Sequence, residues 1–113
     1  MSYRVLTTDL SDIDMARNIS YIIDVLGNRK AAADLLDRYE EVKTEIGDNP
    51  LAFQLSNSKR LADLGVRVRF IGGYAVHYKL IEDRVYILRV VSTLMDVESD
   101  EFLHRLNSAV DSI

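Results

Sequence analysis

Alternating apolar and polar positions predict three consecutive strands of an antiparallel sheet in residues 66–91. In the first run, Val66, Val68 and Phe70 alternate with Arg67 and Arg69. Because successive side chains of a strand point to opposite faces, this run predicts one apolar face, which we expect to be core, and one arginine face. The sheet is therefore expected to carry basic side chains on one side.

A hairpin turn at Gly72 and Gly73 leads into the second run, because glycine permits the positive φ that tight turns require. In residues 74–80 the alternation continues, with His77 and Lys79 on one predicted face and tyrosines on the other. Residues 81–84 form a charged turn, and residues 85–91 are apolar apart from Arg89. Such a run is typical of a strand covered on both faces, so the third strand is expected to be central.

The region before this sheet has helical periodicity. Residues 3–8 form a candidate strand, and Ser11 can cap a first helix that we expect to end near Leu26. Gly27 is a stop signal, and Asn28 can cap a second helix that ends within residues 47–50. The predicted apolar stripes are Ile19, Ile22, Ile23 and Leu26 in the first helix and Ala32, Leu35, Tyr39, Val42 and Ile46 in the second. The short connection between them predicts a helical hairpin.

Residues 51–63 are expected to be a connecting loop, and Leu103, Leu106 and Val110 have the spacing of a C-terminal helix. That helix either packs on the second face of the sheet or frays. The order of elements predicts a single α+β domain over residues 1–113. It consists of an N-terminal strand, a helical hairpin, a three-stranded antiparallel meander and a C-terminal helical tail.

Composition limits the available chemistry. The chain has no cysteine and only two histidines, His77 and His104, so we expect no disulfide, no thiolate chemistry, no metal site and no cofactor. It has no signal-peptide pattern and no apolar run of the roughly 20 residues that a membrane span needs. We therefore expect a cytoplasmic protein with no membrane partner.

The net charge of −4 conceals a segregation of charge along the chain. Residues 1–58 carry 6 basic and 10 acidic side chains, residues 59–89 carry 7 and 3, and residues 90–113 carry 1 and 5. The predicted sheet is thus positive within an otherwise acidic chain. Overall repulsion would weaken non-specific binding to phosphate, so the charge argues against a general nucleic-acid-binding protein.

The basic side chains that could bind a target or another protein are Lys59, Arg60, Arg67, Arg69, Lys79 and Arg89. His77 is predicted on the same face as Arg67 and Arg69, where it could act as a general base beside a phosphate clamp. The simpler alternative is that the arginines are solvated or paired with acidic groups, and that His77 is hydrogen-bonded or at the surface.

Two further sets of side chains have structural interpretations. Tyr74, Tyr78 and Tyr86 share the predicted inward face, which favours core packing over stacking on nucleotides. Arg89 is isolated in an apolar strand, and burial of its guanidinium would require a partner. Asp96 or another group of the acidic tail could provide that partner.

Over nearly its whole length the chain resembles the RelE/ParE superfamily of bacterial toxins from type II toxin–antitoxin systems. The N-terminal half is similar through Asp9-Leu10, residues 19–22, residues 31–36 and Asn49-Pro50. The sheet is similar through Arg67, the run Gly73-Tyr74-Ala75-Val76-His77-Tyr78 and the run Val85-Tyr86-Ile87-Leu88-Arg89-Val90. The resemblance implies a toxin that inhibits growth, has a role in plasmid stabilisation and is neutralised by a cognate antitoxin that wraps around it.

Two activities occur in that superfamily, and residues after the last strand distinguish them. RelE-like members cleave messenger RNA on the ribosome with basic residues after this strand and a tyrosine in the tail, whereas ParE-like members poison DNA gyrase. Residues 92–100 of this chain contain no Arg, Lys, His or Tyr. ParE-like members often carry a basic pair before an aspartate here, and of that motif the chain retains only the aspartate, Asp96.

The leading hypothesis is a gyrase-inhibiting toxin bound by its antitoxin in a hetero-oligomer. The first alternative is a ribosome-dependent endoribonuclease with Arg67, Arg69 and His77 as catalytic residues. The second is a degenerate, non-toxic relative that acts as a binding module.

Overall fold

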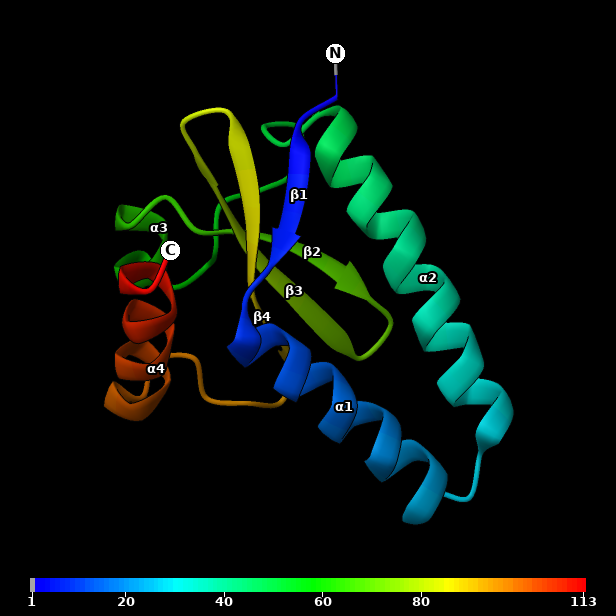
Figure 1. Cartoon of the computed structure of the whole chain (residues 1–113). Coiled ribbons are helices and arrows are strands. Elements are labelled where there is room, and N and C mark those ends of the chain that lie inside the picture. Colours follow the sequence, from blue (N-terminus) through cyan, green and yellow to red (C-terminus); the bar gives the residue numbers. More distant parts are fainter. Residues whose placement is uncertain (1) are drawn as a thin grey trace.

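The computed structural model describes residues 2–113 as a four-stranded mixed sheet with helices on both faces (Figure 1). Its elements are β1 (Arg4–Thr7), α1 (Asp9–Asp24), α2 (Arg29–Asp48), α3 (Lys59–Asp63), β2 (Arg67–Ile71), β3 (Tyr74–Ile81), β4 (Arg84–Ser92) and α4 (Asp100–Asp111). The strand order is β1-β4-β3-β2. Strand β4 pairs in parallel with β1 and antiparallel with β3, which confirms the predicted α+β fold and the central position of β4.

The helical hairpin of α1 and α2 covers one face of the sheet (Figure 1). The predicted stripe of α2 is buried in full, and it packs with side chains of β3 and β4 such as Val76, Tyr78 and Ile87. Asn28 caps α2 as predicted, because its side-chain oxygen accepts the Ala31 N–H. The stripe of α1 is shorter than predicted, since the helix ends at Asp24 and Leu26 is 58% exposed.

The acidic C-terminal tail forms a helix that covers the second face of the sheet. Phe102 and Leu106 of α4 are buried against Leu61, Val66 and Leu88, together with Val91. Of the two predicted alternatives, packing is therefore confirmed over fraying. The predicted loop at residues 51–63 also contains one helical turn, α3, which supplies Leu61 to this second core. No helix of residues 2–113 combines the length and the apolar character that crossing a membrane requires.

The N-terminus of α1 is capped by Thr8, and the prediction that Ser11 is the cap was wrong. Thr8 Oγ1 accepts the Ser11 N–H at 3.1 Å, and Ser11 Oγ accepts the Thr8 N–H at 3.0 Å. Ser11 is thus the third helical residue of a reciprocal capping box. The prediction missed this because Thr8 was assigned to the preceding strand.

Replacing Thr8 with alanine should lower the free energy of unfolding by about 1–2 kcal/mol. The substitution removes an acceptor for the Ser11 N–H and a donor to the Ile87 and Leu88 carbonyl groups. Chemical denaturation followed by circular dichroism measures the loss. Thr7→Ala, at an exposed neighbouring position, is the matched control and should change stability by less than about 0.5 kcal/mol. Equal effects of the two substitutions would contradict the capping role.

Beyond the end of β1, side chains of helix α1 form hydrogen bonds with the backbone of β4. Strand β1 pairs with β4 only as far as Ile87, whereas β4 continues to Ser92. Beyond that point, Asp14 accepts the Val90 N–H at 3.1 Å, and Asn18 donates to the Val90 carbonyl at 2.9 Å. These side chains satisfy backbone groups that an open edge would leave unpaired, and they fix α1 against the end of β4.

A β-bulge in β4 changes which face its later side chains occupy. His77 lies opposite Arg89 and Tyr78 lies opposite Ile87, so Leu88 is the extra residue of β4. Without the bulge, strict alternation from Ile87 would direct Arg89 toward the helical hairpin. With it, Leu88 packs in the core under α4, and Arg89 lies over the Phe102 ring of that helix.

Candidate interaction site at the end of strand β4

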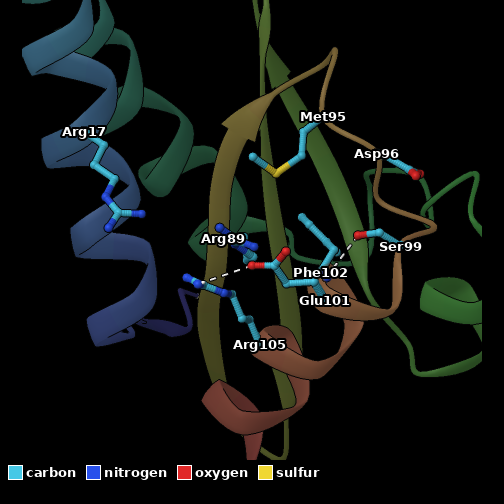
Figure 2. Close-up of a pocket in the computed structure, with 8 residues that line it drawn as sticks. All are labelled: Arg17, Arg89, Met95, Asp96, Ser99, Glu101, Phe102 and Arg105. Atoms are coloured by element: carbon cyan, nitrogen blue, oxygen red, sulfur yellow. Dashed lines mark hydrogen bonds and ion pairs between the residues drawn. The ribbon is translucent and has the colours of Figure 1, made fainter.

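A charged recess of about 300 Å³ lies where α1, the end of β4 and the start of α4 meet (Figure 2). Its lining residues are Arg17, Arg89, Met95, Asp96, Ser99, Glu101, Phe102 and Arg105. Two of these elements are fixed on the sheet by interactions described above: α1 by its bonds to the edge of β4, and α4 by the burial of Phe102 and Leu106. Ser99 caps α4 by accepting the Phe102 N–H at 3.1 Å.

Arg89 forms the inner wall of the recess and is held on two sides. Its Nε and one terminal nitrogen donate to the two carboxylate oxygens of Asp14 at 3.0 and 2.8 Å. The guanidinium carbon lies 4.8 Å from the centre of the Phe102 ring, a cation–π distance. Both ionic side chains are 6% exposed, so this is a buried, two-pronged ion pair.

The prediction that a buried Arg89 needs a partner is confirmed, but the partner is Asp14 and not Asp96. Asp96 is exposed and accepts the Glu98 N–H at 2.9 Å within its own loop. The acidic tail contributes to Arg89 through the face of Phe102 and not through a carboxylate. Sequence distance hid Asp14, which is 75 residues from Arg89.

The outer part of the recess combines both signs of charge. Arg105 pairs with Glu101 at 3.3 Å, both largely exposed, whereas Arg17 makes no ion pair with residues 2–113. No histidine, lysine or tyrosine lines the recess, and the groups in it that could transfer a proton are the carboxylates of Asp96 and Glu101. Its geometry suits the binding of a charged or polar surface of another protein.

Most of the basic side chains predicted to bind a target are engaged in separate local interactions. Lys59 pairs with Asp63 and Arg60 with Asp100, both on the surface. Arg67 donates to the Phe53 carbonyl at 2.7 Å. Arg69 binds Glu45 of α2 at 3.0 Å, and this hydrogen bond lowers the pKa of the Glu45 carboxyl. Lys79 is half-buried, and no salt bridge is found for it among residues 2–113.

His77 does not lie with Arg67 and Arg69, and that part of the prediction was wrong. Arg67 and Arg69 pair with Tyr78 and Val76, whose side chains lie under the helical hairpin. His77 pairs with Val68 on the opposite face, where its ring meets the Phe102 ring edge to face at 5.5 Å. The alternation of faces within each strand was predicted correctly. The register between the two strands was not, because His77 lies opposite Val68 and not opposite an arginine.

The imidazole of His77 is buried and electrically neutral at pH 7. Burial, assisted by the nearby positive charge of Arg89, lowers the pKa of His77 from 6.5 to about 4. The residue is 3% exposed, and neither ring nitrogen has a hydrogen-bond partner within residues 2–113. The arrangement therefore brings together His77, Arg89 and Phe102, and not the set Arg67, Arg69 and His77.

The free energy of unfolding should fall by about 3 kcal/mol between pH 6.5 and pH 4 through His77 alone. The folded-state pKa lies below the unfolded value, so in this window the unfolded chain binds more protons and acid favours unfolding. Urea denaturation at several pH values measures the slope. His77→Phe keeps an aromatic ring and should reduce the slope by that amount, and equal slopes in both proteins would contradict the assignment.

The tyrosines expected in one core lie on two faces. Tyr78 is fully buried under the hairpin, where its hydroxyl donates to the Pro50 carbonyl at 2.7 Å and burial raises its pKa to about 12. Tyr74 packs partly on the same side. Tyr86 packs on the α4 side, so its predicted face was wrong. Phe70, expected in the core, is 43% exposed because it lies on the edge strand β2.

Sequence reasoning missed Asp14, Arg17, Phe102 and Arg105, which contribute to the recess. One available signal was the spacing of Glu101 and Arg105, four residues apart in a predicted helix. A second was the buried stripe of α1, in which Asp14 stands beside Met15. Among residues 2–113, no three acidic or histidine side chains converge in a way that could hold a metal ion.

Comparison with known proteins identifies the family. Residues 5–97 match the family described as the ParE toxin of the type II toxin–antitoxin system, parDE. The match begins at the second residue of β1, includes the hairpin helices and β2 to β4, and ends before α4. No curated protein matches the chain at a significant level. The matched segment contains the hairpin, the whole sheet except Arg4 and the buried Asp14–Arg89 pair, and the chain therefore belongs to the ParE toxin family of type II toxin–antitoxin systems.

Proposed function

We propose that this toxin inhibits bacterial growth by acting on DNA gyrase and is neutralised by a cognate antitoxin in a hetero-oligomeric complex. The observation that supports the proposal is the match of residues 5–97 to the family described as the ParE toxin of the type II toxin–antitoxin system, parDE. Since DNA gyrase and the antitoxin would both be met in the cytoplasm, the proposed site of action is cytoplasmic. A role in plasmid stabilisation follows from the same system.

The geometry of the site supports inhibition by binding over RNA cleavage. His77, whose ring meets that of Phe102, is buried and neutral at pH 7, so it is poorly placed to reach a ribose hydroxyl. Arg89 is fixed by Asp14, so its charge is already balanced and it serves as a structural group of the site. The exposed groups around it can form a rim for another protein.

The surface cations divide into two candidate contact regions. Lys59 and Arg60 lie on α3 near the start of α4, since Arg60 reaches Asp100 at 3.1 Å. Arg67 and Arg69 lie on β2 near α2 and the segment before α3. Lys79 belongs to neither region, because it lies opposite Tyr86, which packs on the α4 side of the sheet. We propose the first region, with Arg17 and Arg105, for the target and the second for the antitoxin.

A supercoiling assay with purified gyrase, relaxed plasmid and ATP tests the proposed target directly. Added toxin should block supercoiling or trap cleaved DNA, and preincubation with the antitoxin should restore activity. Topoisomerase I, which relaxes DNA by a different mechanism, is the control enzyme. Undiminished supercoiling at a large excess of folded toxin would contradict the proposal.

Induced expression of the toxin alone distinguishes the alternatives in cells. Loss of DNA synthesis with filamentation is expected for gyrase inhibition. Immediate loss of protein synthesis, with cleavage of translated messages, would favour ribonuclease activity instead. Normal growth of cells that contain soluble, folded protein would favour a non-toxic binding module.

A further inference from the structure

A second cavity, of about 170 Å³, lies between β2, the segment before α3 and the end of β4. Its lining combines His77, four hydroxyl side chains, two amides and apolar groups, and it contains no charged residue. Phe70 and Met95 line it and are 43% and 44% exposed. The cavity is thus an uncharged polar hollow beside exposed apolar side chains.

The polar groups of this cavity have unused hydrogen-bonding capacity. The hydroxyl oxygens of Ser56, Ser58 and Ser92 each accept one backbone N–H, at 3.1, 3.4 and 3.1 Å. None of these hydroxyls donates to an acceptor among residues 2–113. The His77 ring nitrogens also lack partners there, and the residue is only 3% exposed to solvent. Buried polar groups in folded proteins are nearly always paired, so this set requires an explanation.

The cavity adjoins an open stretch of the sheet edge. Val68 N–H donates to the Gln54 carbonyl, so residues 54–56 cover the first half of β2. By strand alternation, the Phe70 amide and carbonyl face the same way as those of Val68. Beyond β2 they have no backbone partner in the part of the chain that the structure describes. A polypeptide paired at Phe70 would place a side chain directly over the cavity.

We propose that the cavity receives a neutral carboxamide side chain, from Asn or Gln, of an extended antitoxin segment that pairs with β2 at Phe70. The carboxamide oxygen accepts serine O–H groups, and its N–H₂ can donate to the neutral imidazole. A charged side chain is disfavoured because the lining offers no opposite charge. The inference rests on the proposed function, since it assigns part of the surface that the antitoxin covers.

Nuclear magnetic resonance of ¹⁵N-histidine in the toxin, free and in complex with the antitoxin encoded beside it, tests the site. The chain has two histidines, so His104 on the exposed face of α4 serves as an internal control. The ring nitrogen resonances of His77 should move on binding, and those of His104 should not. His77 ring resonances that are identical in the free and the bound toxin overturn the inference. This outcome would arise if a bound water occupied the cavity in both states.

Matched surface substitutions locate the segment without disturbing the core. Phe70→Lys should weaken antitoxin binding by about 30-fold or more, as expected for a central apolar contact. Tyr21→Lys, at a 51% exposed aromatic residue of α1, should change it by less than about threefold. Equal effects of the two substitutions overturn the inference.

The antitoxin side tests the chemistry of the ligand. Alanine substitution of each Asn and Gln in its toxin-binding segment should find one position that weakens binding and abolishes the His77 shift. If no such position exists, the carboxamide assignment is wrong. A normal complex with an unchanged His77 signal removes only this inference, whereas absence of any complex removes the proposed antitoxin partnership with it.

Discussion

Replacing Asp14 with alanine should lower the free energy of unfolding by about 3–5 kcal/mol, as expected when one partner of a buried ion pair is removed. Arg89 would remain buried, 5% exposed, with its guanidinium unpaired inside the fold. The same carboxylate accepts the Val90 N–H, so the substitution also removes the bond that completes this part of the edge of β4. Equilibrium unfolding in urea, followed by circular dichroism, measures the loss.

Two comparisons separate this burial effect from ordinary charge removal. Lys59→Ala breaks an ion pair whose side chains are 87% and 63% exposed, and should change stability by less than about 0.5 kcal/mol. The double variant Asp14→Leu, Arg89→Met removes both charges and should be more stable than Asp14→Ala, because no unpaired charge is left buried. If Asp14→Ala lowers the free energy of unfolding by less than about 1 kcal/mol, the Arg89 guanidinium is exposed to solvent in that variant and the burial argument is wrong.

Replacing Phe102 with alanine should lower the free energy of unfolding by about 3–5 kcal/mol, the range for a large aromatic residue in a core. The residue is 2% exposed, and its ring contacts two other groups of the site, the guanidinium of Arg89 and the His77 ring. Its removal would leave a cavity under α4 and would take away the cation–π contact. Differential scanning calorimetry should show a clearly lower melting temperature.

Phe102→Leu is the matched control, since it keeps most of the apolar volume and loses only the aromatic face. We expect a loss of less than about 1.5 kcal/mol from that change. If alanine and leucine are equally tolerated, α4 does not stabilise the second face of the sheet as the structure has it. The experiment is informative because α4 lies outside the segment that matches the ParE family.

Asp14 and Phe102 also determine which side chains of the recess remain accessible to a binding partner. Asp14 and Phe102 hold Arg89 inside the protein, so a charge-changing substitution of Arg89 would report on folding before it reports on target binding. Arg17 and Arg105, which sequence reasoning did not select, line the accessible part of the recess. They are therefore the better positions at which to test binding of the target.

Local patterns in the sequence predicted the elements of the fold. The α2 stripe from Ala32 to Ile46, the alternation in residues 66–80 and the apolar run of β4 each report the burial of one element by itself. A periodic pattern is sufficient for this, because the side-chain period of a helix or strand is fixed by its backbone. The resemblance to a toxin superfamily rests on the same elements in the same order, and the family match confirms it.

The tertiary structure alone decided how these elements meet. The offset between β2 and β3 places His77 opposite Val68 and away from the arginines, and the bulge at Leu88 directs Arg89 toward Phe102. Neither the register nor the bulge can be predicted from the alternation of apolar and polar residues. A shift of one residue exchanges the two faces of a strand and leaves that alternation unchanged. The pairing of Asp14 with Arg89 likewise joins residues 75 positions apart, so it exists only once α1 lies against β4.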